Sequence, residues 1–127
     1  MTKLIQSALL VLAIALSGQA IAQSAAGPVA TVVTIKTPPG VTRATLDAGF
    51  QKSAPDYEKV PGLIRKYFTT TDDSFGGIYL WKNRAAADTW FNAAWHARVV
   101  KTYGVDGQVT YFDAPLVIEG TNAGGAK

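Results

Sequence analysis

The chain contains no cysteine and a single histidine, His96, among its 127 residues. Without cysteine there can be no disulfide, so a small domain must be stabilised by packing or by association with another chain. A transition-metal site of the usual kind needs three or four histidine, cysteine or carboxylate ligands. This composition argues against such a site, and we expect no metal in the protein.

Sequence motifs of several common enzyme classes are also missing. The chain has no Gly-x-Ser-x-Gly hydrolase motif, no Gly-x-Gly-x-x-Gly run and no Gly-Lys-Ser or Gly-Lys-Thr phosphate loop. Basic residues are scattered, and the formal net charge is only +3. The longest basic run is Arg65-Lys66, so we expect no nucleic-acid partner.

The N-terminal segment has the pattern of a secretory signal peptide. Lys3 is followed by an apolar stretch from Ala8 to Leu16 and by the small-x-small site Ala20-Ile21-Ala22. The alternative is an uncleaved membrane anchor, but the apolar stretch is shorter than the ~20 residues that a spanning helix needs. We therefore predict cleavage after Ala22, a periplasmic or secreted protein, and no membrane association of the mature chain.

The rest of the chain is long enough for one domain. We predict a signal peptide over 1–22, a flexible segment over 23–28, a single domain over 29–120 and a flexible tail over 121–127. Density of β-branched and aromatic residues predicts strands, and 3.6-residue periodicity predicts helices. In chain order these are a strand over 29–37, a helix from 42 to 57, strands over 60–71 and 75–81, a helix from 83 to 104, and a strand over 107–112.

Some positions within these elements carry specific expectations. Pro55 should kink or restart the first helix, and Asn83 should cap the second. Gly76-Gly77 indicates a bulge or a close approach of backbones within a strand. Beyond Pro115, the apolar segment Leu116–Ile118 should lie at a sheet edge or form an arm.

The order strand, helix, strand, strand, helix, strand is that of the ferredoxin-like βαββαβ sandwich, an α+β fold with both helices on one sheet face. The strands carry large apolar side chains on both faces. Exposing the second face would cost a small domain heavily, since one aromatic side chain is worth about 2–3 kcal/mol. We therefore predict a dimer formed through the sheet. The residues that the partner would cover are Leu63, Tyr67, Tyr79 and Trp81, and the residues alone leave open which sheet face lines a pocket and which the dimer.

Four separated segments resemble one known family. They are SAPDYEKVPGLIRKYF, GGIYLW, AAADTWFNAAWHARV and YFDAPLVIEG, and in this order they are similar to the YdhR-type mono-oxygenases. That family falls in the wider group of antibiotic-biosynthesis mono-oxygenases, and the resemblance covers residues 29–120. It implies a homodimeric α/β barrel with a pocket between helices and sheet in each subunit.

The resemblance also implies a chemistry. Some members of the wider group oxidise aromatic substrates with O2 and without a metal, flavin or other cofactor, the substrate supplying the electrons. In such a mechanism His96 is our candidate base for a phenolic proton, and Tyr67 and Arg65 are candidates to stabilise the resulting anion. The side chains expected to contact the substrate are Tyr79, Trp81, Trp90, Asn92 and Trp95.

Other interpretations remain open from the residues alone. Each tryptophan could belong to the core, and His96 lies about 100° around the helix from Trp95. Haem-degrading members of the group need a histidine ligand with a suitably placed asparagine and tryptophan, an arrangement that Asn92 and His96 do not clearly reproduce. The main alternative to an enzyme is a non-catalytic periplasmic dimer that binds a small hydrophobic molecule.

Overall fold

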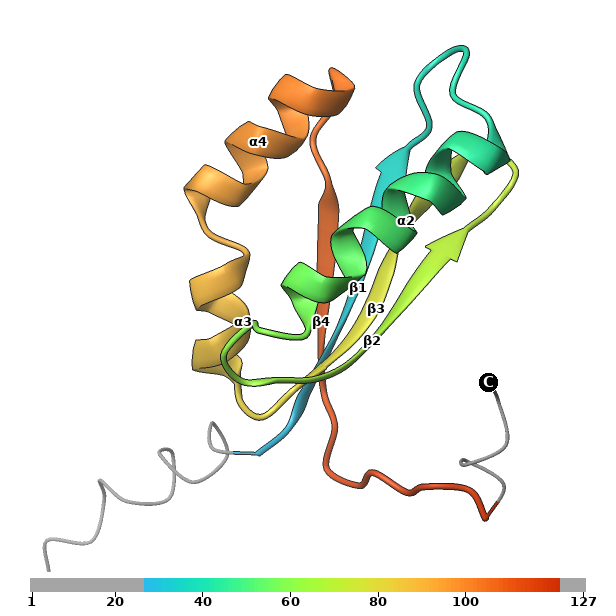
Figure 1. Ribbon diagram of the computed structural model, residues 1–127. Coiled ribbons are helices and arrows are strands. Elements are labelled where there is room, and N and C mark those ends of the chain that lie inside the picture. The colour runs from blue at the N-terminus through green and yellow to red at the C-terminus, as the bar shows by residue number, and fades with distance from the viewer. Residues whose placement is uncertain (1–26, 122–127) are drawn as a thin grey trace, which may run out of the picture.

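The computed structural model describes residues 27–121 (Figure 1). The predicted signal peptide and its cleavage site lie outside these residues, as does most of the predicted tail. Within the described residues no helix is long and apolar enough to cross a membrane.

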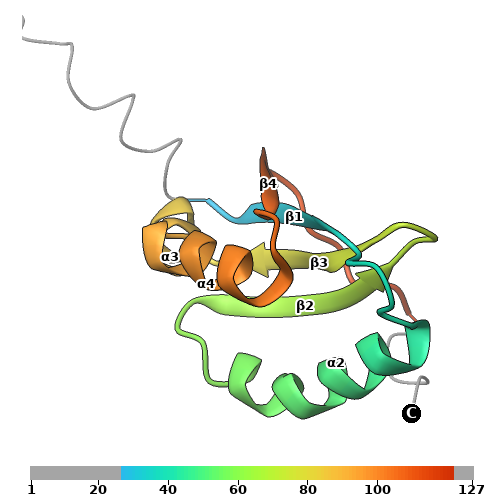
Figure 2. The ribbon, with the colours of Figure 1, turned by 90° about the horizontal axis from the view of Figure 1, so that it is seen from above.

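Four strands and three helices make up the fold. They are β1 (Val29–Lys36), α2 (Arg43–Tyr57), β2 (Leu63–Thr70), β3 (Ser74–Trp81), α3 (Arg84–Trp90), α4 (Ala93–Tyr103) and β4 (Gln108–Asp113). The strands form one antiparallel sheet in the order β2-β3-β1-β4. Figures 1 and 2 show α2 apart from the α3–α4 pair, with β1 and β3 at the centre of the sheet. The predicted ferredoxin-like α+β fold is confirmed.

Burial alternates along the two central strands. In β1 the residues that face the helices are buried, including Val33 and Ile35, while their neighbours are more exposed. In β3 the same face carries Phe75, Tyr79 and Trp81. Trp81 is fully buried, and its indole Nε1 donates a hydrogen bond to Thr31 Oγ1 at 2.9 Å. This hydrogen bond pairs the polar atoms of two buried side chains with each other.

The prediction that Tyr79 and Trp81 lie on the open sheet face is therefore wrong. They face the helices, and Ile78 and Leu80 take the open face. In β2 the pairing skips one residue, because Leu63 pairs with Trp81 and Arg65 with Leu80. This bulge at Ile64 shifts the alternation, so Leu63 packs against the core whereas Tyr67 is exposed.

Helix α2 is continuous through Pro55, so the helix does not restart there. Thr42 caps its N-terminus by accepting a hydrogen bond from the Thr45 amide at 3.2 Å. Pro55 lies in the last turn, so only one helical hydrogen bond is lost near an end that closes at Glu58. No residue of α2 is fully buried. The helix therefore covers the sheet without being embedded in the core.

The single helix predicted from 83 to 104 is two helices. Asn83 caps α3 as expected, and the break follows Phe91, where Asn92 Oδ1 accepts a hydrogen bond from the Trp95 amide at 3.0 Å to cap α4. The break directs Phe91 into the core beside Trp95, their ring centroids 5.0 Å apart.

Two predictions about loops and glycines have clear outcomes. A Cβ at Gly76 would collide with the Val33 carbonyl, which confirms the close backbone approach expected there. After β4 the segment Leu116–Ile118 joins no strand. Next to this segment, Arg65 Nη2 forms an ion pair with Glu119 Oε1 at 2.8 Å. Leu116 and Ile118 are each 81% exposed.

Candidate active site in the cavity between α2 and α4

A cavity of about 680 Å³ lies between α2, α4 and the helix-facing side of the sheet. This volume is within the ~300–1,000 Å³ range of small-molecule sites. Strands β1, β2 and β3 form its floor, and residues of the two helices and Trp90 at the end of α3 form its walls. The site therefore exists because α2 and α4 do not pack directly on each other.

Eight aromatic side chains line the cavity. The rings come from α2, β2, β3, α3 and α4 and are Phe50, Tyr57, Phe68, Phe75, Tyr79, Trp90, Trp95 and Tyr103. Tyr57 joins several of them, since its centroid lies 5.5 Å from those of both Phe68 and Trp90. Such tilted and edge-to-face contacts hold flat walls in fixed orientations. The cavity is suited to a flat organic molecule.

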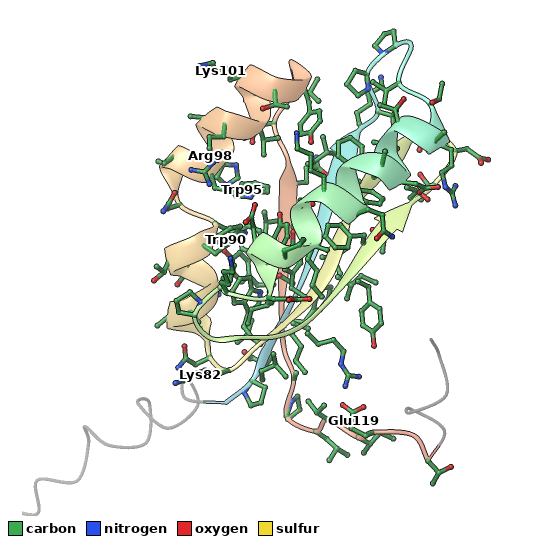
Figure 3. The ribbon with its side chains drawn as sticks, viewed as in Figure 1. Lys82, Trp90, Trp95, Arg98, Lys101 and Glu119 are labelled. Carbon is green, nitrogen blue, oxygen red and sulfur yellow. The ribbon has the colours of Figure 1, made fainter. Side chains whose placement is uncertain are left out.

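A few polar side chains interrupt this wall. They are Thr45, Ser53, Asp56, Lys66, Arg98 and Thr102. In addition, Trp90 Nε1 is buried and has no hydrogen-bond partner among the residues that the structure describes. Figure 3 shows Trp90 and Trp95 on the α3–α4 side of the fold.

Lys66 has the most unusual environment of these groups. It extends from β2 toward the helices, and its Nζ lies 3.0 Å from the ring centroid of Tyr57, 3.9 Å from that of Phe68 and 4.7 Å from that of Tyr79. No carboxylate in residues 27–121 forms a salt bridge with it. Burial lowers the pKa of the Lys66 ammonium to about 6.

The neighbouring strand leaves space for this lysine. A Cβ at Gly77 would lie 3.1 Å from Lys66 Cε and 2.9 Å from both Tyr79 Cε2 and the Tyr67 carbonyl. A side chain at residue 77 would therefore occupy the space of the lysine arm. The second glycine of the pair thus shapes the cavity as well as the sheet.

The tyrosines around Lys66 keep their protons. Burial raises the pKa of Tyr57, and burial with the nearby Tyr57 raises that of Tyr79. Both phenols are neutral near physiological pH and can donate hydrogen bonds. Near neutral pH the proton of Lys66 is therefore held less tightly than those of its two tyrosine neighbours.

The structure brings together three of the five predicted substrate-contacting residues. Tyr79, Trp90 and Trp95 line the cavity, whereas Trp81 and Asn92 do not. Trp81 lies beneath the wall, stacked on Tyr79 with centroids 5.7 Å apart and hydrogen-bonded to Thr31. Asn92 is occupied in capping α4, and its Nδ2 donates to the Thr89 carbonyl at 2.9 Å.

The three predicted catalytic residues lie outside the cavity. His96 points away from it, and its Nδ1 donates to Asp106 Oδ1 at 2.7 Å, which lowers the pKa of that carboxyl. Tyr67 and Arg65 lie on the open sheet face, where Arg65 Nη1 donates to Tyr67 Oη at 3.5 Å. His96 is thus not grouped with Tyr67 and Arg65 within this chain. Lys66 was not among the predicted site residues, although strand alternation allows only one of Arg65 and Lys66 to point inward.

The cavity wall contains no histidine, cysteine or methionine within the described residues. Residues 27–121 also contain no group of three or more histidine, cysteine or acidic side chains placed to hold a metal. Among the described residues, the wall does not provide the histidine ligand expected of the haem-degrading members.

The sequence profile of the family described as "Putative mono-oxygenase ydhR" matches residues 33–117. The chain belongs to the YdhR family. The match runs from β1 past β4 and so includes every element that lines the cavity. A search of curated proteins finds no significant match.

Solved structures support the fold of this YdhR-family chain. SnoaB, a cofactor-independent oxygenase from Streptomyces nogalater, is 20% identical with a TM-score of 0.51, and the match covers 73% of this chain and 98% of SnoaB. A monooxygenase from Streptomyces coelicolor in complex with nanaomycin D is 14% identical, with a TM-score of 0.54 and coverage of 80% and 99%. A haem-degrading protein from Mycobacterium tuberculosis is 19% identical, with a TM-score of 0.51 and coverage of 75% and 99%.

Proposed function

We propose that this YdhR-family protein is a mono-oxygenase that oxidises a small aromatic or phenolic substrate with O2 and without a cofactor. The observation that carries the proposal is the cavity of about 680 Å³ walled by eight aromatic side chains. Its chemistry follows that of the cofactor-independent oxygenase SnoaB, which shares the fold. The cavity would hold the substrate flat and exclude water from the reacting carbon.

Without a cofactor, the substrate itself must be the reductant. A ring methylene beside an ionised hydroxyl meets this requirement, because its carbon can exchange two hydrogens for one oxygen atom of O2. The second oxygen atom leaves with those hydrogens as water, so that atoms and electrons balance. Anthrone-like phenols, which carry such a methylene, are therefore the substrates to test first, with hydroquinones beside them in the panel.

The test is oxygen uptake by metal-stripped protein across such a panel. The variant Gly49→Leu should lower uptake and binding, because Gly49 lines the cavity and a Cβ there meets no atom within 4 Å. Ala48→Leu is the matched control, since Ala48 is the next residue of α2, is exposed and does not line the cavity. Equal effects of the two variants would argue against the cavity as the site.

A second candidate function is a binding protein without turnover, supported by the same apolar cavity. Binding that quenches tryptophan fluorescence, with no oxygen uptake across the panel, would favour this alternative. Oxygen uptake that requires the protein and is lost in Gly49→Leu would favour the enzyme. Tryptophan fluorescence is a suitable probe because Trp90 and Trp95 both line the cavity.

A homodimer formed through the open sheet face is also part of the proposal. Pairing across the strands aligns Tyr67, Ile78 and Val32 in one row that ends at Thr110, and Leu80, Ala30 and Phe112 in a neighbouring row that begins at Arg65. Tyr67 is 54% exposed and Phe112 51%. An antiparallel sheet with one solvated face carries polar residues there, so this apolar face fits contact with a second copy.

We further propose export of the protein, supported by the signal-like sequence over residues 1–22. Intact-mass measurement of protein produced in a secreting bacterial host tests this expectation. A mature N-terminus at Gln23 supports export, and retention of Met1 in the cytoplasm contradicts it.

A further inference from the structure

Lys66 is built into the cavity as an amine without an ionic partner among the described residues. Three aromatic rings surround its Nζ, at distances between 3.0 and 4.7 Å from their centroids. Gly77 leaves open the space in which its arm lies. Both features hold the amine at the cavity wall rather than in solvent, where lysine side chains ordinarily end.

From this geometry, and on the basis of the proposed function, we propose that Lys66 accepts the proton of an aromatic hydroxyl group bound in the cavity. The O–H bond of the ligand breaks, its electron pair stays on oxygen, and the proton forms an N–H bond on Lys66. The product is an ammonium and an aryloxide in contact. The ligand class is therefore a flat aromatic molecule with an acidic hydroxyl.

The charged and titratable groups around the cavity are compatible with this role. Tyr57 and Asp56 face it from α2, Tyr79 from β3, and Arg98 and Tyr103 from α4. Burial holds Tyr57 and Tyr79 in their neutral forms, so neither competes as the proton acceptor. The pKa of Lys66, lowered to about 6, leaves its amine mostly unprotonated at neutral pH.

An aryloxide in the cavity would favour the protonated form of Lys66 instead. The faces of three aromatic rings already favour a cation at Nζ, in opposition to the cost of burial. A negative charge nearby adds a Coulombic attraction that is strong in an apolar site. Ligand binding is thus expected to raise the proton affinity of Lys66 as the hydroxyl loses its proton.

The experiment uses umbelliferone, a fluorescent phenol whose excitation band shifts on ionisation, and its methyl ether, which cannot ionise. Binding is measured near neutral pH, below the ligand's own ionisation, by excitation spectrum and by calorimetry in buffers of different ionisation enthalpy. The wild-type protein should bind umbelliferone as its anion with no net proton release. The proton has simply moved from ligand to Lys66.

Two variants distinguish a base from a mere cation. Lys66→Met should bind umbelliferone in its neutral form, with the anion band lost. Lys66→Arg keeps a positive charge that cannot accept a proton, so anion binding should release about one proton to the buffer. Lys52→Met is the control, because Lys52 is exposed on α2 and does not line the cavity.

The possible results separate this inference from the proposed function. Wild-type binding of neutral umbelliferone, or of its anion with proton release, overturns the role of Lys66 and leaves the oxygenase proposal standing. Anion binding without proton release, combined with no oxygen uptake on any substrate, supports Lys66 and overturns the oxygenase. Absence of binding by either coumarin overturns the inference, and the oxygenase is then judged by the oxygen-uptake panel alone.

A measurement without ligand guards against variants that fail to fold. The reactivity of each lysine toward acetic anhydride, followed by mass spectrometry against pH, reports its state in the intact protein. Lys66 should become reactive at lower pH than Lys52. A Lys66 that stays protonated to the same pH as Lys52 overturns the inference.

Discussion

Arg65 and Lys66 are consecutive cations with opposite surroundings. Lys66 points into an aromatic cavity, whereas Arg65 lies on the open sheet face in an ion pair with Glu119. The difference comes from the bulge at Ile64, because an unbroken alternation from the inward-facing Leu63 would point Arg65 inward. One extra residue in a strand therefore decides which side chain enters the cavity.

The same bulge limits what could be predicted about the site. Aromatic character led to Tyr79, Trp90 and Trp95, which line the cavity, and equally to Trp81, which does not. A bulge leaves no recognisable pattern in LIRKYF, so Lys66 was missed and Tyr67 was placed beside His96. His96 was selected for its chemistry alone, and the sequence gives no sign of its contact with Asp106.

The first prediction concerns stability and follows from the depressed pKa of Lys66. Below pH ~6 both folded and unfolded chains carry the proton, and the folded state bears the full cost of the buried charge. Lys66→Met should then raise the free energy of unfolding, by about 1.4 kcal/mol per unit of pKa depression. The gain in unfolding free energy from Lys66→Met should shrink as pH rises from about 6 toward 10.5. Over this range Lys66 is already neutral in the folded protein but still protonated in the unfolded chain, so the wild type regains stability.

Urea unfolding at several pH values measures this effect, with Lys52→Met as the exposed control. The control should show little change at any pH. A Lys66→Met variant whose stability follows the wild type in parallel from pH ~6 to ~10.5 would mean that the Lys66 pKa is not depressed.

At the scale of elements, α2 and α4 form opposite cavity walls with different support. Helix α4 contributes Trp95 and Val99 to the core, while α2 contributes no buried residue. Hydrogen exchange should therefore be faster in the central amides of α2 than in those of α4, by about ten-fold or more for each ~1.4 kcal/mol of difference in opening free energy.

A ligand held in the cavity touches both helices and should slow exchange in α2 more than in α4. Exchange measured by mass spectrometry with and without umbelliferone tests this expectation. Equal protection of the two helices in the free protein would show that α2 is fixed by more than its visible contacts.

The presence of helices and strands was predicted more reliably than the breaks within and between them. Four strands and the first helix follow from β-branched density and periodicity. The division of the second helix was missed because apolar residues keep helical spacing through Asn92, and the same asparagine is plausible inside a helix or as a cap. At Pro55 the error was the opposite, because an interruption was predicted where the helix continues. A proline so close to a helix end is tolerated.

At the scale of the whole molecule, the open sheet face gives the prediction for assembly. Ile78→Glu should convert a dimer to monomers, because it places a charge at the centre of the apolar rows and does not touch the cavity. Lys52→Glu, on the exposed side of α2, should leave the dimer intact. Light scattering after gel filtration gives both masses, and circular dichroism checks that each variant is folded.

A wild-type protein that is monomeric at micromolar concentration would contradict the proposed assembly. The open face would then need another cover, and the segment with the strongly exposed Leu116 and Ile118 would be the first to consider. Dimerisation retained by Ile78→Glu would instead place the contact on a different surface.

The alternation of Lys66 and Tyr67 on β2 has a consequence for regulation. One peptide bond joins a cavity residue to a residue of the open face, so any backbone shift that a ligand causes at Lys66 would reach Tyr67. In a dimer built on that face, occupancy and assembly become reciprocal: whatever factor the partner applies to ligand affinity, the ligand applies to the dimer constant. Ligand saturation curves should then depend on protein concentration, because a ligand bound in one copy would affect binding in the other through the sheet.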